Sequence, residues 1–357
     1  MSKKNGFLVL ESGETFQGEW ISGPDKAGEV VFNTSHSGFE EMATDPSYFS
    51  QILVCTASQQ GNYGADPAVW ESDKVHIQGF IALEIQNSDR EKTWVKTLEK
   101  NNVPIFHKVD TRKLTMSLRK GTQWGALVQS ETKAEALEKS QSLIAKAKNI
   151  DPDWAFLVSK KQKEIRKGAK KNGLRIAMID YGVKENILRE TLALVEEVCI
   201  FPSRTSHKEI LDYKPSGIIL SNGPGDPALV EKSVDTIKAL LGVKPIFGIC
   251  MGHQLLSLAL GGKTYKLKFG HRGANHPIKD NIAQKIYMTS QNHGYAVDAK
   301  SLSMDIDVTH VNLYDNTVAG IRSKKWNALS VQFHPENSPG PRDARYLFEH
   351  FVELLGR

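Results

Sequence analysis

A cysteine at the turn between a strand and a helix is the feature of this sequence with the clearest chemistry. Residues 245–249 are apolar and typical of a buried strand, and a helical pattern runs from about 251 to 260. The turn reads Gly248-Ile249-Cys250-Met251-Gly252, the form of a nucleophile elbow with cysteine in place of serine. Glycines permit a tight turn, and a helix N-terminus favours the thiolate. Cys250 is therefore a candidate nucleophile, although a lone cysteine is more often a structural residue.

A histidine and a carboxylate further along the chain complete a possible triad. His334 and Glu336 are separated by Pro335, which favours an extended conformation for the residue before it. In an extended chain, side chains two positions apart point the same way, so Glu336 can orient the imidazole. Taken alone, His-Pro-Glu favours an ordinary turn over a catalytic pair. With the cysteine elbow it predicts a Cys-His-Glu triad, in an order that differs from α/β-hydrolases, where the acid precedes the histidine.

Besides the possible triad, the sequence contains a glycine-rich loop, an incomplete phosphate-binding motif and a group of histidines. Residues 221–227, Ser-Asn-Gly-Pro-Gly-Asp-Pro, fit an oxyanion hole and a tight turn equally well. Residues 261–264, Gly-Gly-Lys-Thr, resemble the end of a phosphate-binding loop, but the required first glycine is replaced by Ser257. Four histidines in the second half of the chain lack a recognisable ligand spacing, so we expect no metal site: they are His271, His276, His293 and His310.

Short apolar strands alternate with helices in the second half of the chain, which predicts an α/β domain with a parallel sheet covered on both faces. Ligand sites in such sheets form at the carboxyl ends of the strands. The expected strands are 174–179, 196–201, 217–220 and 245–249. The expected helices are 184–194, 206–213, 229–241 and 251–260.

The first part of the chain has a mixed pattern that predicts an α+β domain over residues 1–155. Strands are expected at 7–10, 29–32, 52–55 and 80–85, and helices near 92–101 and 131–148. A basic stretch follows: residues 159–172 hold seven lysines and arginines and one acid, Glu164. We interpret residues 156–172 as a solvated linker, in preference to an anion-binding patch, and residues 173–357 as the second domain.

Composition limits the class of protein. The chain has 357 residues and a net charge of +5, but without the basic stretch it is close to neutral, so a nucleic-acid function is not indicated. Three cysteines far apart in sequence argue against a disulfide framework. No apolar stretch is long enough for a signal peptide or a membrane span. These features together predict a soluble, cytoplasmic protein without a membrane role.

The elbow and the His-Pro-Glu segment resemble the class I glutamine amidotransferases, which implies a doubly wound, flavodoxin-like second domain. Other stretches single out the small, glutamine-hydrolysing subunits of carbamoyl phosphate synthetase, and the resemblance covers nearly the whole chain. These stretches are residues 32–51, 61–64, 110–115, 180–184, 269–273 and 291–295. The chain departs from the family pattern at residues 86–91 and 151–158.

The resemblance implies a mechanism and a substrate site. Cys250 would attack the side-chain amide of glutamine, His334 would act as acid and base, and Glu336 would orient His334. The backbone N–H groups of Met251 and Gly225 would stabilise the oxyanion. Further glutamine-binding positions are Ser47, Gly223, Gln254, Asn292, Gly294 and Tyr295. Ser47 belongs to the first domain, so the resemblance puts the glutamine pocket close to the domain interface.

The resemblance also implies a partner and leaves alternatives open. A large subunit would bind ATP and Mg²⁺ and make carbamoyl phosphate from bicarbonate and ammonia for arginine and pyrimidine biosynthesis. This chain itself would need no cofactor and would form a heterodimer with that subunit. The alternatives are a glutaminase for another synthetase, a stand-alone cysteine amidohydrolase, and a noncatalytic scaffold subunit.

Overall fold

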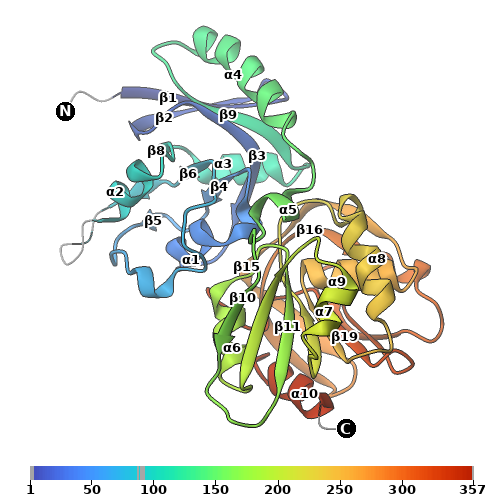
Figure 1. The fold of residues 1–357 in the computed structure, drawn as a ribbon. Helices are drawn as coiled ribbons and strands as arrows, with labels where there is room; N and C mark the ends of the chain where they lie inside the picture. The colour runs from blue at the N-terminus through green and yellow to red at the C-terminus, as the bar shows by residue number, and fades with distance from the viewer. Residues whose placement is uncertain (1–3, 87, 89–92, 356–357) are drawn as a thin grey trace. The chain divides into compact units, whose positions relative to one another are not determined.

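The computed structural model of the chain describes residues 4–86, 88 and 93–355 and divides into two units, Met1–Asp151 and Pro152–Arg357. Figure 1 shows the first unit in blue to green and the second in green to red. Most of segment 86–91, which departs from the family pattern, lies outside the described residues. Among the described helices, none is both long and apolar enough to cross a membrane.

The first unit is built on a closed barrel with strand order β1-β2-β8-β6-β4-β3-β9. Its strands are β1 (Lys4–Leu10), β2 (Thr15–Ser22), β3 (Lys26–Asn33), β4 (Gln51–Cys55), β6 (Gly79–Ile81), β8 (Ile105–His107) and β9 (Gln123–Gln129). The expected strand 80–85 is wrong as a single element. Its residues divide between β6 and the short strand β7 (Glu84–Ile85), which pairs in a separate sheet with β5 (Gln59–Gln60).

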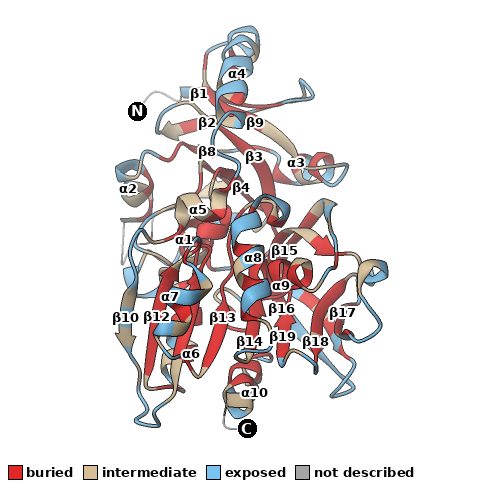
Figure 2. Cartoon of the chain, turned by 45° about the vertical axis from the view of Figure 1, so that its right-hand side comes forward, coloured by how far each residue is buried: buried red, intermediate tan, exposed pale blue. Residues whose placement is uncertain are grey.

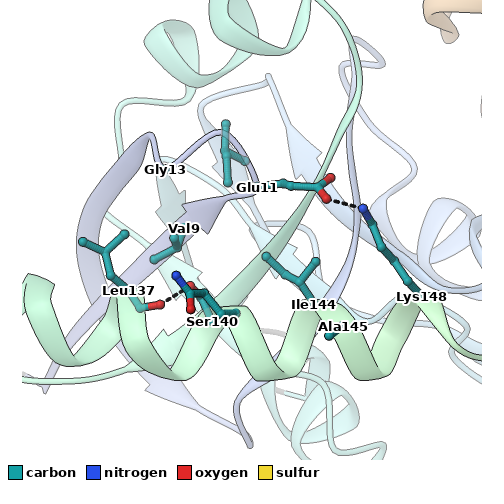
Figure 3. Close-up of a pocket in the computed structure, with 10 residues that line it drawn as sticks. Val9, Glu11, Gly13, Leu137, Ser140, Ile144, Ala145 and Lys148 are labelled. Carbon is teal, nitrogen blue, oxygen red and sulfur yellow. Dashed lines mark hydrogen bonds and ion pairs between the residues drawn. The ribbon is translucent and has the colours of Figure 1, made fainter.

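Helices and short 3₁₀ turns complete the first unit. They are α1 (Phe39–Thr44), η1 (Pro46–Tyr48), η2 (Pro67–Val69), α2 (Thr93–Lys100), α3 (Thr111–Leu118) and α4 (Lys133–Lys148). Helix α4 packs Ala136 and Ile144 into a core with Phe7 and Val9 of β1. A pocket of about 330 Å³ lies between β1 and α4, with the Glu11–Lys148 ion pair at its side (Figure 3). None of the predicted site residues lines this pocket.

The second unit is built on a ten-stranded sheet with order β10-β12-β11-β13-β14-β19-β18-β17-β15-β16. Its strands are β10 (Glu164–Lys167), β11 (Arg175–Asp180), β12 (Glu197–Pro202), β13 (Gly217–Leu220), β14 (Ile246–Ile249), β15 (Thr264–Asp280), β16 (Lys285–Val297), β17 (Asp307–Asn312), β18 (Val318–Ser323) and β19 (Ala328–Val331). The run β12-β11-β13-β14-β19 is parallel. In chain order this is 2-1-3-4-5, the flavodoxin-like order, so the predicted doubly wound fold is confirmed.

Helices cover both faces of this sheet because neighbouring residues of each strand point to opposite sides. Ile176 and Met178 of β11 pack in the core with α6 and α10, whereas Ala177 and Ile179 pack in the core with α7, α8 and α9. The helical elements are α5 (Trp154–Val158), α6 (Glu185–Leu192), α7 (His207–Asp212), η3 (Pro227–Leu229), α8 (Glu231–Leu240), α9 (Met251–Ala259), η4 (Ala299–Ser301) and α10 (Tyr346–Leu355). Figure 2 shows the central strands buried and one side of α8 exposed.

The basic stretch differs from the solvated linker expected over residues 156–172. Its middle part forms β10, which pairs antiparallel with β12 at the edge of the sheet. Acids pair with part of its charge: Arg166 pairs with Glu164 and Glu185, and Lys167 pairs with Glu197. Edge strands commonly carry exposed lysines, which make their sequence look like that of a solvated linker. For this reason the strand was not recognised in the sequence.

Candidate active site

Cys250 lies at the turn where β14 ends and α9 begins. Its backbone has φ 53° and ψ −101°, a strained conformation for a residue that carries a side chain. Its N–H donates to the carbonyl oxygen of Val331 at 2.9 Å, and its carbonyl accepts the N–H of Gln254 at 3.2 Å. The turn is therefore held on both sides, and the predicted elbow is present in the structure.

Both glycines of the elbow are needed for close backbone approach. A Cβ atom at Gly252 would lie 2.1 Å from the carbonyl oxygen of Leu220, and one at Gly248 would lie 2.6 Å from the carbonyl oxygen of Gly252. Both contacts are with backbone atoms, which cannot rotate away. The spacing Gly-x-Cys-x-Gly therefore reflects the packing of α9 against β13 as well as the turn itself.

We expect Gly252→Ala to lower the free energy of unfolding of the second unit by about 3 kcal/mol, because the methyl group forces α9 away from Leu220. Urea denaturation of the two variants measures the effect. Gly261→Ala is the matched control: its Cβ meets nothing within 4 Å, and only its φ of 89° opposes a side chain, which costs about 1 kcal/mol. Equal losses in the two variants would show that contact with Leu220 does not impose the glycine.

The predicted triad residues come together from two elements. Nδ1 of His334 lies 2.6 Å from Oε1 of Glu336, and both side chains are almost completely buried. The N–H of His334 donates to the carbonyl oxygen of Ser290 at 2.9 Å, which ties the loop after β19 to β16. Cys250 lies close enough to His334 to affect its protonation. The second ring nitrogen of His334, Nε2, has no hydrogen-bond partner among the described residues.

Electrostatics in this cluster favour the charged forms of His334 and Glu336. Burial alone would lower the pKa of His334, but the Glu336 carboxylate and Cys250 raise it above its ordinary value. Burial alone would raise the pKa of Glu336, but Lys184 and His334 lower it. An imidazolium stabilised beside a thiol is suited to hold the proton that the thiol loses.

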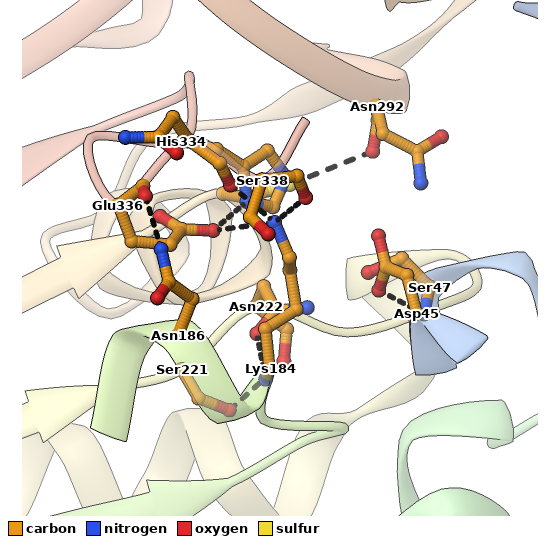
Figure 4. Close-up of polar contacts among 12 residues, drawn as sticks. Asp45, Ser47, Lys184, Asn186, Ser221, Asn222, Asn292, His334, Glu336 and Ser338 are labelled. Atoms are coloured by element: carbon orange, nitrogen blue, oxygen red, sulfur yellow. Dashed lines mark hydrogen bonds and ion pairs between the residues drawn. The ribbon is translucent and has the colours of Figure 1, made fainter. Parts of the chain in front are cut away.

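Lys184 is a member of the site that the sequence analysis missed. Its side chain is 3 % exposed, and its Nζ donates to Oε1 of Glu336 at 3.0 Å. The same Nζ donates to the carbonyl oxygens of Asn337 at 2.7 Å and Ser338 at 2.8 Å (Figure 4). The amide of Asn186 also donates to the backbone carbonyl of Glu336. The position of Lys184, just after β11 at the carboxyl edge of the sheet, was the available signal.

The glycine-rich loop after β13 interlocks with the loop that carries Lys184. The N–H of Lys184 donates to the side-chain oxygen of Asn222 at 3.0 Å (Figure 4). The N–H of Tyr181 donates to Oγ of Ser221 at 2.9 Å. A Cβ atom at Gly223 would lie 2.2 Å from the carbonyl oxygen of Tyr181. The loop is therefore packed tightly where it supports the site.

The two backbone donors that the resemblance implies, on Gly225 and Met251, are available in the structure. Gly225 has φ 93°, and Met251 is the first residue of α9. Within the described part of the chain, the N–H groups of these two residues have no hydrogen-bond partner, whereas the next one, on Gly252, donates to the carbonyl oxygen of Ser221 at 2.9 Å. Unpaired N–H groups at a helix N-terminus are suited to bind negatively charged oxygen.

The remaining predicted positions of the second unit cluster on α9 and β16. Nε2 of Gln254 donates to the carbonyl oxygen of Tyr295 at 2.8 Å and to Oε1 of Gln332 at 3.1 Å. Sγ of Cys250 lies 3.8 Å from the carbonyl oxygen of Asn292 and 3.8 Å from Nε2 of Gln332. Gln332 is thus a second residue that the sequence analysis missed.

For two of the predicted glutamine-binding positions, Gly294 and Ser47, the structure gives a location but no contact that indicates a role in binding. Gly294 lies on β16 between Asn292 and Tyr295. Ser47 is in the first unit, in η1, where its N–H donates to Oδ1 of Asp45 at 2.8 Å. The part that these two residues take in binding glutamine stays a prediction.

Comparison with known proteins adds family information to this geometry. The sequence pattern described as "Glutamine amidotransferase class-I" matches residues 177–354, and that of "Carbamoyl-phosphate synthase small chain, CPSase domain" matches residues 8–128. The chain is similar to the carbamoyl phosphate synthase small chain of Methanocaldococcus jannaschii, with 43% identity over 98% of this chain and 99% of that one. The same-named protein of Oceanobacillus iheyensis is also 43% identical, over 98% of this chain and 95% of that one. That of Porphyra purpurea is 41% identical, over 99% and 98%.

Proposed function

Since the chain belongs to the family of carbamoyl phosphate synthase small chains, we propose that it hydrolyses glutamine with a Cys250-His334-Glu336 triad and passes the ammonia to a large synthetase subunit. The observation that carries this proposal is the buried pairing of His334 with Glu336 beside a cysteine at a strained elbow. A structural cysteine needs neither the strained backbone nor a neighbouring charged imidazole.

In the first half of the reaction, Cys250 attacks the side-chain amide carbon of glutamine. His334 holds at Nε2 the proton that the Cys250 thiol has lost, and Glu336 accepts a hydrogen bond from Nδ1 and stabilises this imidazolium beside the thiolate. The carbonyl oxygen becomes an oxyanion, which accepts hydrogen bonds from the N–H groups of Met251 and Gly225. His334 then gives its proton to the leaving nitrogen, the C–N bond breaks, and ammonia departs from a glutamyl thioester.

In the second half, water hydrolyses the thioester. His334 takes a proton from the water, whose oxygen attacks the thioester carbon, and the same two N–H groups stabilise the second oxyanion. The C–S bond breaks, the Cys250 sulfur departs as the thiolate beside charged His334, and glutamate leaves. The cycle needs no group beyond glutamine, water and this chain's own residues.

Glutamine itself is held, in this proposal, by residues around the elbow. Gln254 and the β16 positions Asn292, Gly294 and Tyr295 lie on the elements nearest Cys250, and Gly223 lies on the loop beside it. Ser47 of the first unit would complete the set. The hydrogen bond between Gln254 and Tyr295 supports a common role, because it fixes a side chain of α9 against β16.

The partner in this proposal is the large subunit, which binds ATP and Mg²⁺ and uses bicarbonate and the ammonia to make carbamoyl phosphate for arginine and pyrimidine biosynthesis. Ammonia must travel within the heterodimer, since in neutral water it is protonated and loses its nucleophilicity. We place the protein in the cytoplasm, which its three unpaired cysteines support.

We expect the purified chain to hydrolyse glutamine slowly, and much faster when the large subunit, ATP and bicarbonate are present, because uncoupled hydrolysis would waste ammonia. Glutamate release, measured with and without the co-expressed large subunit, tests this. A fast rate without partner would favour a stand-alone amidohydrolase. No hydrolysis in either condition would contradict the proposed function and favour a scaffold.

A further inference from the structure

Gln332 brings a side-chain amide to the sulfur of the proposed nucleophile. Its Nε2 lies 3.8 Å from Sγ of Cys250, and the residue is 1 % exposed. A second polar atom at 3.8 Å from the same sulfur, the carbonyl oxygen of Asn292, accepts hydrogen bonds but donates none. The form of the cysteine that this surrounding favours therefore depends on which end of the Gln332 amide faces the sulfur.

A chain of hydrogen bonds fixes the orientation of that amide. A backbone carbonyl oxygen only accepts, so the Gln254 atom 2.8 Å from the carbonyl oxygen of Tyr295 must be the amide nitrogen. The same nitrogen lies 3.1 Å from the Gln332 side chain and donates there too, so the Gln332 atom that faces it must be Oε1. This leaves the Gln332 nitrogen directed at Cys250, and a donor at the sulfur favours the thiolate over the thiol.

The backbone around Gln332 is held in place on both sides. The N–H of Cys250 donates to the carbonyl oxygen of Val331 at 2.9 Å, which joins the elbow to the residue before Gln332. The N–H of Gln332 donates to the carbonyl oxygen of Ala319 at 2.9 Å. His334 follows two positions later on the same segment. One short segment thus presents both an amide donor and the proposed base to the sulfur.

The proposed reaction gives the sulfur a negative charge at two points. It is a thiolate before it attacks the amide, and it leaves as a thiolate when the C–S bond of the thioester breaks. Burial opposes this charge, and charged His334 offsets part of that cost. A fixed N–H group aimed at the charge stabilises it further and needs no reorganisation during the reaction.

We propose that Gln332 is a catalytic residue of the glutaminase, which donates a hydrogen bond from Nε2 to the thiolate of Cys250. This inference rests on the proposed function for its place in the reaction, but the donor at the sulfur is measurable without glutamine. Gln254 and the carbonyl oxygen of Tyr295 act through Gln332 as positioning groups, because they set which end of its amide faces the sulfur.

Other ionisable groups define the background of a measurement on this sulfur. On the elements around the elbow they are Lys184, His253, Arg272, His293, His334 and Glu336. Burial lowers the pKa of His253 to about 3 and that of His293 well below its ordinary range, so both are neutral near pH 7. Arg272 keeps its charge throughout. The ionisation to be followed therefore belongs to the pair of Cys250 and His334.

The test follows alkylation of Cys250 by iodoacetamide against pH, in the small chain assembled with its large subunit, by mass spectrometry of the Cys250 peptide. Gln332→Leu removes the donor and nearly keeps the volume. We expect the pH of half-maximal alkylation to rise by about one unit, the size of effect typical for a hydrogen bond to a charged group, while the maximum rate is retained. The acidic limb of kcat/KM for glutamine, which reports ionisations of the free enzyme, should rise with it.

Two more variants and a control separate charge from packing. Gln332→Glu keeps an oxygen for the N–H of Gln254 but replaces the amide nitrogen by carboxylate oxygen, so the pH of half-maximal alkylation should rise further than in Gln332→Leu. If Gln332→Leu does not fold, Gln332→Met removes the same donor with an unbranched side chain. Ser330→Ala is the matched control, because it removes a buried hydrogen bond of 2.8 Å between β19 and His253 of α9. Its alkylation profile should match that of wild type.

The outcomes distinguish this inference from the proposed function. An unchanged pH of half-maximal alkylation in the Gln332 variants, a smaller rise in Gln332→Glu than in Gln332→Leu, or an equal rise in Ser330→Ala would overturn the inference. So would a loss of maximum rate with the profile otherwise unmoved, which indicates packing alone. A wild-type assembly that is alkylated at Cys250 but does not hydrolyse glutamine would instead remove the proposed function.

Discussion

The Cys250→Ala variant, assembled with the large subunit, is expected to lose glutamine-dependent carbamoyl phosphate synthesis and to keep ammonia-dependent synthesis. Removing a covalent nucleophile costs on the order of 10⁴- to 10⁶-fold in kcat, because the thioester route no longer exists. Ammonia added to the medium bypasses that route. Both activities are measured as carbamoyl phosphate formed from bicarbonate and ATP, with glutamine or an ammonium salt as the nitrogen source.

Cys199 supplies the control for this experiment. It is also buried in the second unit, but it lies on β12 in the core between the sheet and the helices. Cys199→Ala should retain both activities at close to wild-type levels. Equal loss of the glutamine- and ammonia-dependent activities in Cys250→Ala would contradict the nucleophile role, since it would indicate damage to the whole assembly.

The parallel part of the second unit could be predicted from sequence because each of its strands is short, apolar and followed by a helix. Residues 217–220 were expected as a strand and form β13. The expected strand 245–249 and helix 251–260 correspond to β14 and α9 within one residue at each end. In such a sheet local pattern and global burial agree, so the elbow between two of these elements was also visible.

Antiparallel strands were harder to predict, because their residues alternate in burial and their partners are distant in sequence. In strand β2 only Phe16 and Trp20 are buried, and its partners include β8, far along the chain. The long hairpin of β15 and β16 contains glycine, proline and many polar residues, so no apolar run marked it. Such strands are stabilised by the side chains of the neighbouring strands with which they pair. Patterns within a single sequence do not show which strands will be neighbours.

Lys184 illustrates why part of the site could not be predicted. A lysine after a strand is usually a solvated residue, and nothing in the sequence links it to Glu336, 152 positions away. Only the fold brings β11 and the loop after β19 together. Its nearly complete burial is the evidence of its role, because an isolated buried ammonium group would be costly and must be paired.

The Lys184→Met variant is expected to show a fall of about ten- to a hundredfold in kcat for glutamine. Lys184 fixes Glu336, which orients His334, and losing such an outer partner of a functional histidine typically has an effect of this size. Without the ammonium group, the Glu336 carboxylate loses the charge that does most to lower its pKa. Its pKa should then rise, so that Glu336 becomes protonated at mildly acidic pH and no longer stabilises charged His334. The acidic limb of the kcat profile should therefore move toward neutral pH by about one pH unit or more.

The same shift has a defined sign in stability. A carboxyl group whose pKa is lowered in the folded state contributes stability above its unfolded pKa, about 4.3 for glutamate, and that contribution is lost as pH falls through the folded pKa. Lys184→Met should lower the free energy of unfolding by about 3 kcal/mol near neutral pH, since it breaks a buried ion pair. Acid destabilisation should begin at a higher pH than in wild type.

Two further variants separate charge from hydrogen bonding at this position. Lys184→Gln keeps a donor for the carbonyl oxygens of Asn337 and Ser338 but removes the charge, so its acidic limb should move as it does in Lys184→Met. Asn186→Ala removes a donor to the backbone carbonyl of Glu336 and leaves the carboxylate alone, so its acidic limb should stay in place. If the limb stays fixed in both Lys184 variants while kcat falls, Lys184 acts by holding the 337–338 backbone, and its charge is not what tunes Glu336.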